Sequence, residues 1–288
     1  MSPVRTWMFI PGSDMKKMEK ARHLSSDVLI YDLEDAVSIN EKATARQMVQ
    51  NEIRSNSKQV KYIRINGSGT SFFYDDIHDL LDKNLKGIVL PKSESADQMR
   101  LLDGVITQLE RKRGITHGSI EIMPLIESAL GLHFTYEIAS SSQRVKRLAF
   151  GSMDFALDIN AQLTMEGTEL LFARSQLVSS SRAAGIEAPI DTVFIDIKDS
   201  VNLMKETAFV KQLGFQGKLL IHPSQIEIVN EVFKPTIQEI EEAGLIISAF
   251  DGAVRNGTGV VQVRGKMVDQ PVVERAKKIL QTAKLLDL

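Results

Sequence analysis

The sequence contains no cysteine, which excludes disulfides, thiolate catalysis and cysteine-ligated metal centres. It has no excess of charge of either sign, because 35 basic residues stand against 37 acidic ones, so no general attraction to nucleic acid or to an anionic membrane is expected. It has no long apolar signal segment, and no apolar run approaches the roughly 18 residues of a membrane span. We therefore expect a cytoplasmic protein whose nucleophiles and ligands are oxygen and nitrogen groups.

The chain does contain eight short apolar runs, several of them β-branched. They cover residues 7–12, 27–35, 60–67, 85–94, 120–128, 147–154, 192–199 and 218–225. Helix-like segments lie between them, for example 14–24, 41–55, 95–112, 167–184 and 200–213. Continuous apolar strands that alternate with helices are typical of a parallel sheet covered on both faces. Eight such units predict a closed (β/α)8 TIM barrel, with an open doubly wound sheet as the alternative.

The pattern changes after residue 230. A helix-like stretch over 236–253 is followed by "VVQVRGKMV", which predicts a hairpin with its turn at Arg264 and Gly265, and by an amphipathic helix over 271–286. We therefore divide the chain into a TIM-barrel catalytic domain of residues 1–232 and a C-terminal extension of residues 233–288. This helix–hairpin–helix lid could cap the barrel mouth or reach a neighbouring subunit.

Each apolar run ends in polar residues, and in a TIM barrel these ends meet at the mouth where the chemistry takes place. Glu127 and Asp154 end consecutive strands, and two carboxylates with room for waters suit Mg²⁺. The alternative is that each caps the helix that follows it. The other strand-end residues are Ser13, Glu34, Asp35, Arg64, Asn66, Lys92, Asp196 and His222.

Arg64 can offer its planar guanidinium to a carboxylate near that metal, or form a salt bridge with the neighbouring "DLED" segment. The residues alone favour the salt bridge. Within this segment Asp32 and Glu34 share a strand face, and Asp35 lies nearer the loop. Glu34 or Asp35 can orient metal-bound water or Arg64, and a structural ion pair is the equal alternative.

Two further groups carry a functional and a structural interpretation. Ser13 or Asp14 is expected to cap a helix on which Lys16 and Lys20 share one face, either as a phosphate site or as a solvated surface. His222 can bond a ligand or satisfy a carbonyl at the barrel top. Asp269 is expected to be the N-cap of the last helix.

Ordered motifs run from about residue 5 to residue 285: "MFIPGS", "YDLEDAV", "RIN", "VLPK", "PLIES", "FGSMD", "EGTELLFAR", "AAGIEAPIDTVFID", "LGFQGK" and "GKMVDQPVVERA". Together they resemble the citrate lyase β-subunit-like proteins, a branch of the aldolase superfamily that also contains malyl-CoA and citramalyl-CoA lyases. The resemblance implies a (β/α)8 barrel, usually trimeric, that cleaves or forms a carbon–carbon bond in an acyl thioester with Mg²⁺, or with Mn²⁺ in its place.

The resemblance also implies roles for individual residues. Glu127 and Asp154 match the family's metal ligands, and Arg64 matches its substrate-binding arginine. Asp269 matches an aspartate that an adjacent subunit's lid brings in as the acid/base. The positions that match contacts of coenzyme A are Phe9, Lys16 and Lys20, and the loop of His222 and Pro223 resembles one beside the coenzyme.

These matches predict a lyase acting alone on malyl-, citramalyl- or citryl-CoA, with acyl-CoA and a 2-oxo acid as products and a homotrimer or hexamer as the assembly. The alternative is a citrate lyase β subunit that needs an acyl carrier protein and a transferase subunit. A noncatalytic oligomeric scaffold is a second alternative, but a scaffold has no need of Arg64, Glu127, Asp154 and Asp269 together.

Overall fold

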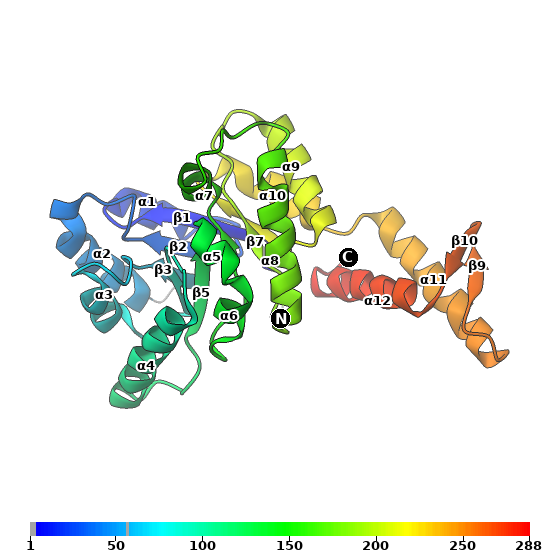
Figure 1. Ribbon diagram of the computed structural model, residues 1–288, viewed down its shortest axis with the longest axis horizontal. Helices are drawn as coiled ribbons and strands as arrows, with labels where there is room; N and C mark the ends of the chain where they lie inside the picture. Colours follow the sequence, from blue (N-terminus) through cyan, green and yellow to red (C-terminus); the bar gives the residue numbers. More distant parts are fainter. Residues whose placement is uncertain (1–3, 56–57) are drawn as a thin grey trace. The chain divides into compact units, whose positions relative to one another are not determined.

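The computed structural model describes residues 4–55 and 58–288 of the chain. Eight parallel strands form a closed barrel in chain order, which confirms the predicted TIM barrel (Figure 1). The strands are β1 (Thr6–Pro11), β2 (Val28–Asp32), β3 (Val60–Arg64), β4 (Gly87–Leu90), β5 (Glu121–Ile126), β6 (Ala149–Phe150), β7 (Ile190–Asp191) and β8 (Gly217–Leu220).

Helices connect the strands and surround the barrel. They are α1 (Met15–Ala21), α2 (Lys42–Arg54), α3 (Phe73–Leu80), α4 (Ala96–Arg113), α5 (Ala129–His133), α6 (Thr135–Ser140), α7 (Ser152–Asp158), α8 (Leu171–Ala183), α9 (Ser200–Leu213) and α10 (Ser224–Phe233), with 3₁₀ turns η1 (Ile39–Glu41) and η2 (Thr168–Leu170). The five helices predicted in this part of the chain are present within a few residues. The bounds of α4 show local control: a capping box of Ser95 and Gln98 starts it, and Gly114 at φ 65° ends it.

The predicted seventh strand over residues 192–199 is wrong, because the strand lies earlier, at Ile190–Asp191. Beyond it the chain leaves the sheet, and the Thr192 hydroxyl accepts the backbone N–H of Ser152. Thr192 and Phe194 are buried, but Ile195 is 60% exposed and Ile197 is 45% exposed, so the second half of the apolar run that suggested a strand lies at the surface. Asp196 caps a turn by accepting the Lys198 N–H and does not end a strand.

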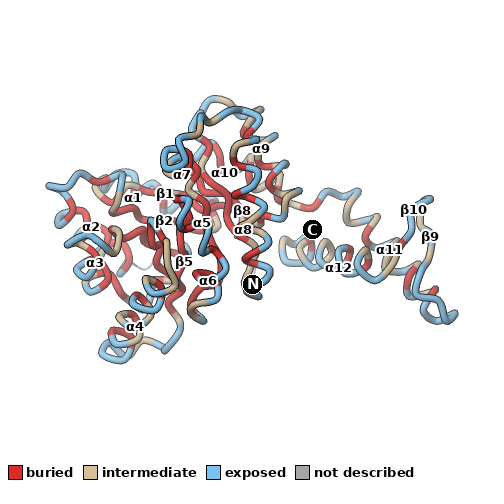
Figure 2. The backbone as a smooth tube through the Cα atoms, in the orientation of Figure 1, coloured by how far each residue is buried: buried red, intermediate tan, exposed pale blue. Residues whose placement is uncertain are grey.

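The barrel interior is apolar and closely packed. Figure 2 shows the strands buried and the outer faces of the helices exposed. Trp7 and Tyr62 pack edge to face in the interior, with ring centroids 5.0 Å apart. Gly87, the register partner of Tyr62, has no room for a side chain, because a Cβ there would lie 2.3 Å from the Tyr62 ring.

A set of polar side chains closes the N-terminal end of the barrel; we call it the basal network. It consists of Tyr62, Lys86, Glu121, Arg147 and Glu187. Glu121, the first residue of β5, accepts from the Tyr62 hydroxyl at 2.5 Å, from Arg147 at 2.8 Å and from Lys86 at 2.7 Å. Arg147 also pairs with Glu187 at 2.8 Å and lies 5.2 Å above the centre of the Trp7 ring. Every buried charge of this network therefore has an opposite charge beside it.

Residues 230–288 form a second compact unit, separate from the barrel unit of residues 4–229. It contains α11 (Ile237–Arg255), the strands β9 (Val261–Val263) and β10 (Lys266–Val268), and α12 (Gln270–Leu285), with α11 and α12 side by side (Figure 1). The hairpin turn lies at Arg264 (φ 49°) and Gly265 (φ 81°), as predicted. Over the described residues, no helix is both long enough and apolar enough to span a membrane.

Candidate active site

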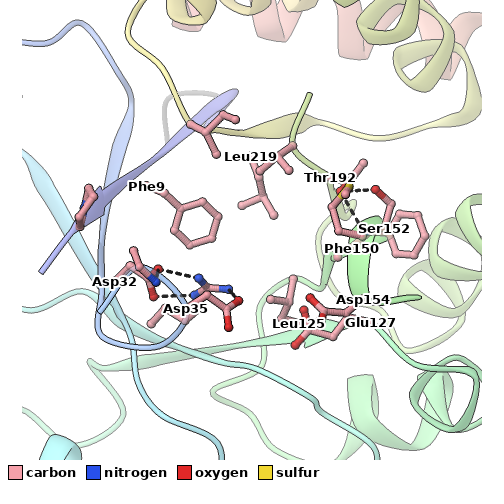
Figure 3. A pocket seen from close by; sticks show the side chains of 17 residues that line it. Phe9, Asp32, Asp35, Leu125, Glu127, Phe150, Ser152, Asp154, Thr192 and Leu219 are labelled. Atoms are coloured by element: carbon pink, nitrogen blue, oxygen red, sulfur yellow. Dashed lines mark hydrogen bonds and ion pairs between the residues drawn. The ribbon is translucent and has the colours of Figure 1, made fainter. Parts of the chain in front are cut away.

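A cavity of about 380 Å³ lies at the C-terminal ends of the barrel strands (Figure 3). One part of its wall is apolar and is formed by Phe9, Leu125, Phe150, Val193 and Leu219. The polar part is formed by Asp32, Asp35, Arg64, Glu127 and Asp154. The cavity therefore combines an apolar surface with four acidic side chains and one arginine.

Arg64 is the last residue of β3 and is held by carboxylates from the neighbouring strand. Its Nε and Nη2 donate to the two oxygens of Asp32 at 2.7 and 2.6 Å, a bidentate pair. Its Nη1 lies 3.2 Å from both Glu34 and Asp35, and the guanidinium stands 4.8 Å above the Phe9 ring. Burial opposes the charge, but these three carboxylates raise the pKa of Arg64 above its ordinary value. The salt bridge that the residues favoured is present, and Arg64 nevertheless lines the cavity.

Glu127 follows β5 and is almost completely buried. Its Oε1 accepts the backbone N–H of Lys92 at 2.7 Å. Gly151 makes room for it, since a Cβ at that position would lie 2.5 Å from Glu127 Oε2. Burial, together with the negative charges of Glu34 and Asp154, raises the pKa of the Glu127 carboxyl to about 8. The hydrogen bond from the Lys92 N–H opposes this rise. A positive charge nearby would therefore stabilise the ionised form of the Glu127 carboxyl group.

Asp154 is the third residue of α7, whose start is anchored to the end of β7. The Ser152 N–H donates to Thr192 Oγ1 at 3.0 Å, and the two hydroxyls lie 2.8 Å apart. Figure 3 shows the carboxyl groups of Asp154 and Glu127 in the same cavity. The fixed start of α7 thus helps to determine where the Asp154 carboxylate lies.

Neither Glu127 nor Asp154 is the N-cap residue of the helix that follows it. Ser128, not Glu127, caps α5, by accepting the Gly131 N–H. Asp154 lies inside α7, whose N-cap residue is Gly151. The capping interpretation is wrong for both residues, because each points its carboxyl group into the cavity instead.

We divide the site into an Arg64 half and a half that contains Glu127 and Asp154. Glu34 links them, because it contacts both Arg64 and Lys92, the residue whose N–H binds Glu127. It lies 3.2 Å from Arg64 through Oε2 and 3.4 Å from the Lys92 ammonium through Oε1. Burial raises the pKa of Glu34, and the nearby Arg64 opposes this rise. For Lys92 burial again disfavours the charge, but Glu34, Asp35 and the two cavity carboxylates outweigh it and raise the pKa.

Within residues 4–55 and 58–288, no three side chains of histidine, aspartate or glutamate converge as a complete metal site. Glu127 and Asp154 line one cavity as a pair. This pair fits Mg²⁺, since that ion commonly keeps several waters and binds proteins through only one or two carboxylates. The buried Glu127 carboxyl, with its raised pKa, is a group that a cation would stabilise in its charged form.

The cavity does not collect every residue that the sequence singled out. Among the described residues its lining includes Phe9 but not Lys16, Lys20, His222 or Pro223. Lys16 and Lys20 are exposed on α1, which is capped by Asp14 as predicted. His222 and Pro223 are exposed after β8, and the His222 ring bonds to Ser224.

Asp269 belongs to the second unit. It caps α12 by accepting the Val272 N–H at 3.3 Å, which confirms the predicted N-cap.

Other residues of the site were missed. In the sequence Lys92 is only a strand-end residue, and nothing marks Gly151, Ser152 or Thr192 for a role in the site. Asp32 carried a usable signal, because it ends a strand next to the strand that Arg64 ends. The expectation that Glu34 shares its strand face is wrong, since β2 ends at Asp32. Thr192 carried no such signal, since the apolar run predicts a strand that starts at Thr192, whereas β7 ends just before it.

A closed parallel barrel with an acidic, metal-competent pair and an arginine at the C-terminal ends of its strands has the architecture of a TIM-barrel enzyme. Comparison with known families is more specific. The chain belongs to the HpcH/HpaI aldolase/citrate lyase family, whose model matches residues 5–223. A second model, the C–C bond lyases of the TIM-barrel fold, matches residues 173–287. The protein is therefore a carbon–carbon lyase.

Individual relatives span nearly the whole chain. Citrate lyase subunit beta of Leuconostoc mesenteroides subsp. cremoris is 40% identical over 283 residues, which cover 97% of this chain and 93% of that protein. L-malyl-CoA/beta-methylmalyl-CoA lyase of Cereibacter sphaeroides is 33% identical and covers 99% of this chain and 96% of its own length. The solved structure of CitE from Mycobacterium tuberculosis in complex with magnesium, acetoacetate and coenzyme A is 26% identical, with a TM-score of 0.80 over 97% of this chain and 98% of that one.

Proposed function

We propose that the protein is a Mg²⁺-dependent lyase that acts on 3-hydroxy-3-carboxyacyl-CoA thioesters such as malyl-, citramalyl- or citryl-CoA. It cleaves them to an acyl-CoA and a 2-oxo acid, or catalyses the reverse condensation. The observation that carries this proposal is the meeting of Glu127, Asp154 and Arg64 at one cavity of the barrel mouth. The malyl-CoA lyase relative and the CitE complex with magnesium and coenzyme A support it.

In this proposal Glu127 and Asp154 hold the metal ion, Mg²⁺ or alternatively Mn²⁺, and water fills the remaining positions. When bound, the ion supplies positive charge for the oxygen atoms of the 2-oxo acid half. Arg64 adds a second positive charge for the carboxylate of that half, and Asp32 keeps the guanidinium in place. Glu34 and Asp35 orient Arg64 through its Nη1.

The chemistry requires two proton transfers. In cleavage the substrate hydroxyl loses its proton, the carbon–carbon bond breaks, and its electron pair moves into the thioester as an enolate. The enolate carbon then takes a proton and becomes the acyl-CoA. We assign this second transfer to Asp269 of an adjacent subunit, which acts as acid in cleavage and as base in condensation.

The remaining assignments follow the same proposal. Phe9, Lys16, Lys20, His222 and Pro223 contact the coenzyme A part of the substrate. The protein forms a homotrimer or hexamer in which the C-terminal unit of one subunit serves the mouth of another. Its cytoplasmic location stays a prediction.

The decisive experiment measures release of acetyl-CoA or propionyl-CoA from malyl-, citramalyl-, methylmalyl- and citryl-CoA, with Mg²⁺ and with excess chelator. Metal-dependent release from any of the four supports the proposal. Folded protein that releases nothing from all four contradicts it. The variants Glu127→Gln and Asp154→Asn are expected to lose Mg²⁺ binding and activity together.

Asp269 allows a matched pair of variants. Asn caps a helix as well as Asp does, so Asp269→Asn keeps the start of α12 while removing the acid/base. We expect loss of hydrogen–deuterium exchange at the acetyl methyl group of acetyl-CoA in the presence of the 2-oxo acid, with unchanged melting temperature. Asp269→Ala removes both the acid/base and the helix cap, and is the control that shows what loss of the cap does to the melting temperature. Undiminished exchange in Asp269→Asn would exclude Asp269 as the acid/base.

A second candidate is a citrate lyase β subunit that acts on a citryl group held by an acyl carrier protein. The observation in its favour is the 40% identity to a citrate lyase subunit beta, higher than the 33% to the malyl-CoA lyase. It predicts silence on free CoA esters and activity once a citryl-loaded carrier protein is added.

A further inference from the structure

Lys92 occupies an unusual backbone conformation at the end of β4. Its φ is 48°, in the left-handed region where any residue with a side chain is disfavoured and where glycine fits best. In this conformation its N–H donates to Glu127 Oε1 at 2.7 Å. Backbone strain of this kind persists where the surrounding structure holds it in place, and it is often found at functional sites.

The side chain of Lys92 reaches the half of the site that contains Arg64, by way of Glu34. Its ammonium lies 3.4 Å from Glu34 Oε1, and Glu34 Oε2 lies 3.2 Å from Arg64 Nη1. Lys92 therefore contacts a proposed metal ligand through its backbone and the partner of the proposed substrate-binding arginine through its side chain. A glycine would relieve the strain and keep the N–H, but it would lose the ammonium.

We propose that Lys92 is a positioning residue that couples the two halves of the lyase site, an inference that rests on the proposed function. Its backbone N–H fixes the Glu127 carboxylate for the metal. Its ammonium shares the charge of Glu34 and so leaves Arg64 available to the carboxylate of the 2-oxo acid. Neither role needs Lys92 to touch the reacting atoms.

Removal of the ammonium is expected to change the two binding events in opposite directions. Glu127 and Asp154, the proposed metal ligands, lose a nearby positive charge, so Mg²⁺ binds more tightly. Glu34 loses its second cation and pairs more strongly with Arg64, so the 2-oxo acid binds more weakly. A residue that only maintains the local fold would weaken both.

The experiment is calorimetric titration of the full-length wild type, Lys92→Met, Lys92→Gly and Lys92→Arg, first with Mg²⁺ and then with pyruvate or glyoxylate at saturating Mg²⁺. For Lys92→Met we expect Mg²⁺ to bind about threefold more tightly and the 2-oxo acid about threefold to fivefold more weakly, since the Lys92 side chain is 57% exposed and its charge is partly screened. Lys92→Gly should show the same two changes with a higher melting temperature than Lys92→Met, because glycine adopts φ 48° without strain. Lys92→Arg should restore both affinities toward the wild type.

Three results would overturn the inference. Wild-type affinities in Lys92→Met exclude a role for the ammonium, and a parallel loss of both affinities together with a lower melting temperature assigns Lys92 a structural role only. A wild-type protein that binds neither Mg²⁺ nor 2-oxo acid overturns the proposed function itself, and the Lys92 role with it.

Discussion

Glu121 is the first residue of β5 and Glu127 directly follows its last, and the two side chains have opposite surroundings. Glu121, in the basal network, accepts hydrogen bonds from Tyr62 and Arg147 and pairs with Lys86. Glu127, at the mouth, accepts the Lys92 N–H and lies among other carboxylates. Burial raises the pKa of both, but the positive neighbours of Glu121 outweigh burial and lower its pKa, whereas the pKa of Glu127 rises to about 8.

The comparison separates a stabilising cluster from a functional one. Charge at the base is compensated within the protein, so its contribution is to the fold. Charge at the mouth is compensated only in part and becomes favourable when a cation binds. Two predictions test this difference and a third concerns charges outside both clusters; they follow in order of decreasing effect.

The largest effect is expected from Arg147→Met. It leaves the buried Glu121 without its buried cation, which should lower the free energy of unfolding by about 3–5 kcal/mol. Urea unfolding measures this loss. Lys86→Met is the matched control, because Lys86 pairs with the same carboxylate but its side chain is 41% exposed, so its removal should cost at most about 1 kcal/mol. Equal losses in the two variants would show that burial does not distinguish them.

A smaller effect of opposite sign is expected from Glu127→Gln. At pH 8 without divalent metal the variant should be more stable than the wild type by up to about 4 kcal/mol, because it removes a carboxyl group whose ionisation is unfavourable in the fold. The same variant should lose Mg²⁺ binding, so added Mg²⁺ should raise the melting temperature of the wild type only.

The pH dependence of that difference follows from the two pKa values. Below the ordinary pKa of 4.5 the carboxyl group is protonated in both the folded and the unfolded protein and contributes nothing. Between pH 4.5 and about 8 the unfolded protein loses the proton while the folded protein keeps it, so wild-type stability falls as pH rises. Unfolding curves from pH 5 to pH 9 should show the advantage of Glu127→Gln growing and then levelling off near pH 8, and a constant difference would contradict the raised pKa.

The smallest effect is expected outside both charge clusters. The double variant Lys16→Ala and Lys20→Ala changes exposed side chains, so stability should stay constant while KM for a CoA thioester rises about threefold to tenfold. High salt should shrink this difference, since exposed charges are screened. Lys17→Ala on the same helix is the control, and an equal rise in KM there would indicate general electrostatics and not specific contacts.

Much of the barrel was predictable because strand and helix periods are local properties of the chain. The runs that became β1 to β6 and β8 are buried where they were expected, and the hairpin turn at Arg264 and Gly265 follows from local backbone preference. The seventh strand was misplaced because hydrophobicity does not reveal exposure: Ile195 and Ile197 are apolar and lie outside the sheet.

The candidate site was predictable in its composition and in the salt bridge of Arg64 with the "DLED" segment, but not in its other pairings. Strand ends identified Glu127 and Arg64 as mouth residues, since parallel strands end on the same side. Asp154 also lines the cavity, but it was wrongly expected to end a strand, because β6 ends at Phe150 and Asp154 lies in α7. The strand ends could not say that Asp32 takes two donors of Arg64, that the Lys92 N–H holds Glu127, or that Thr192 anchors α7. Those partners are 32, 35 and 40 residues apart in the chain.

The sequence by itself determined the architecture, the family and the acidic character of the mouth, because periodicity and ordered motifs are written along the chain. The tertiary structure alone decided which charges are compensated. Glu121 and Glu127 are the same residue type at the start of β5 and just after its end, and their pKa values move in opposite directions. Burial and through-space partners cause this difference, and both exist only once distant segments have packed together.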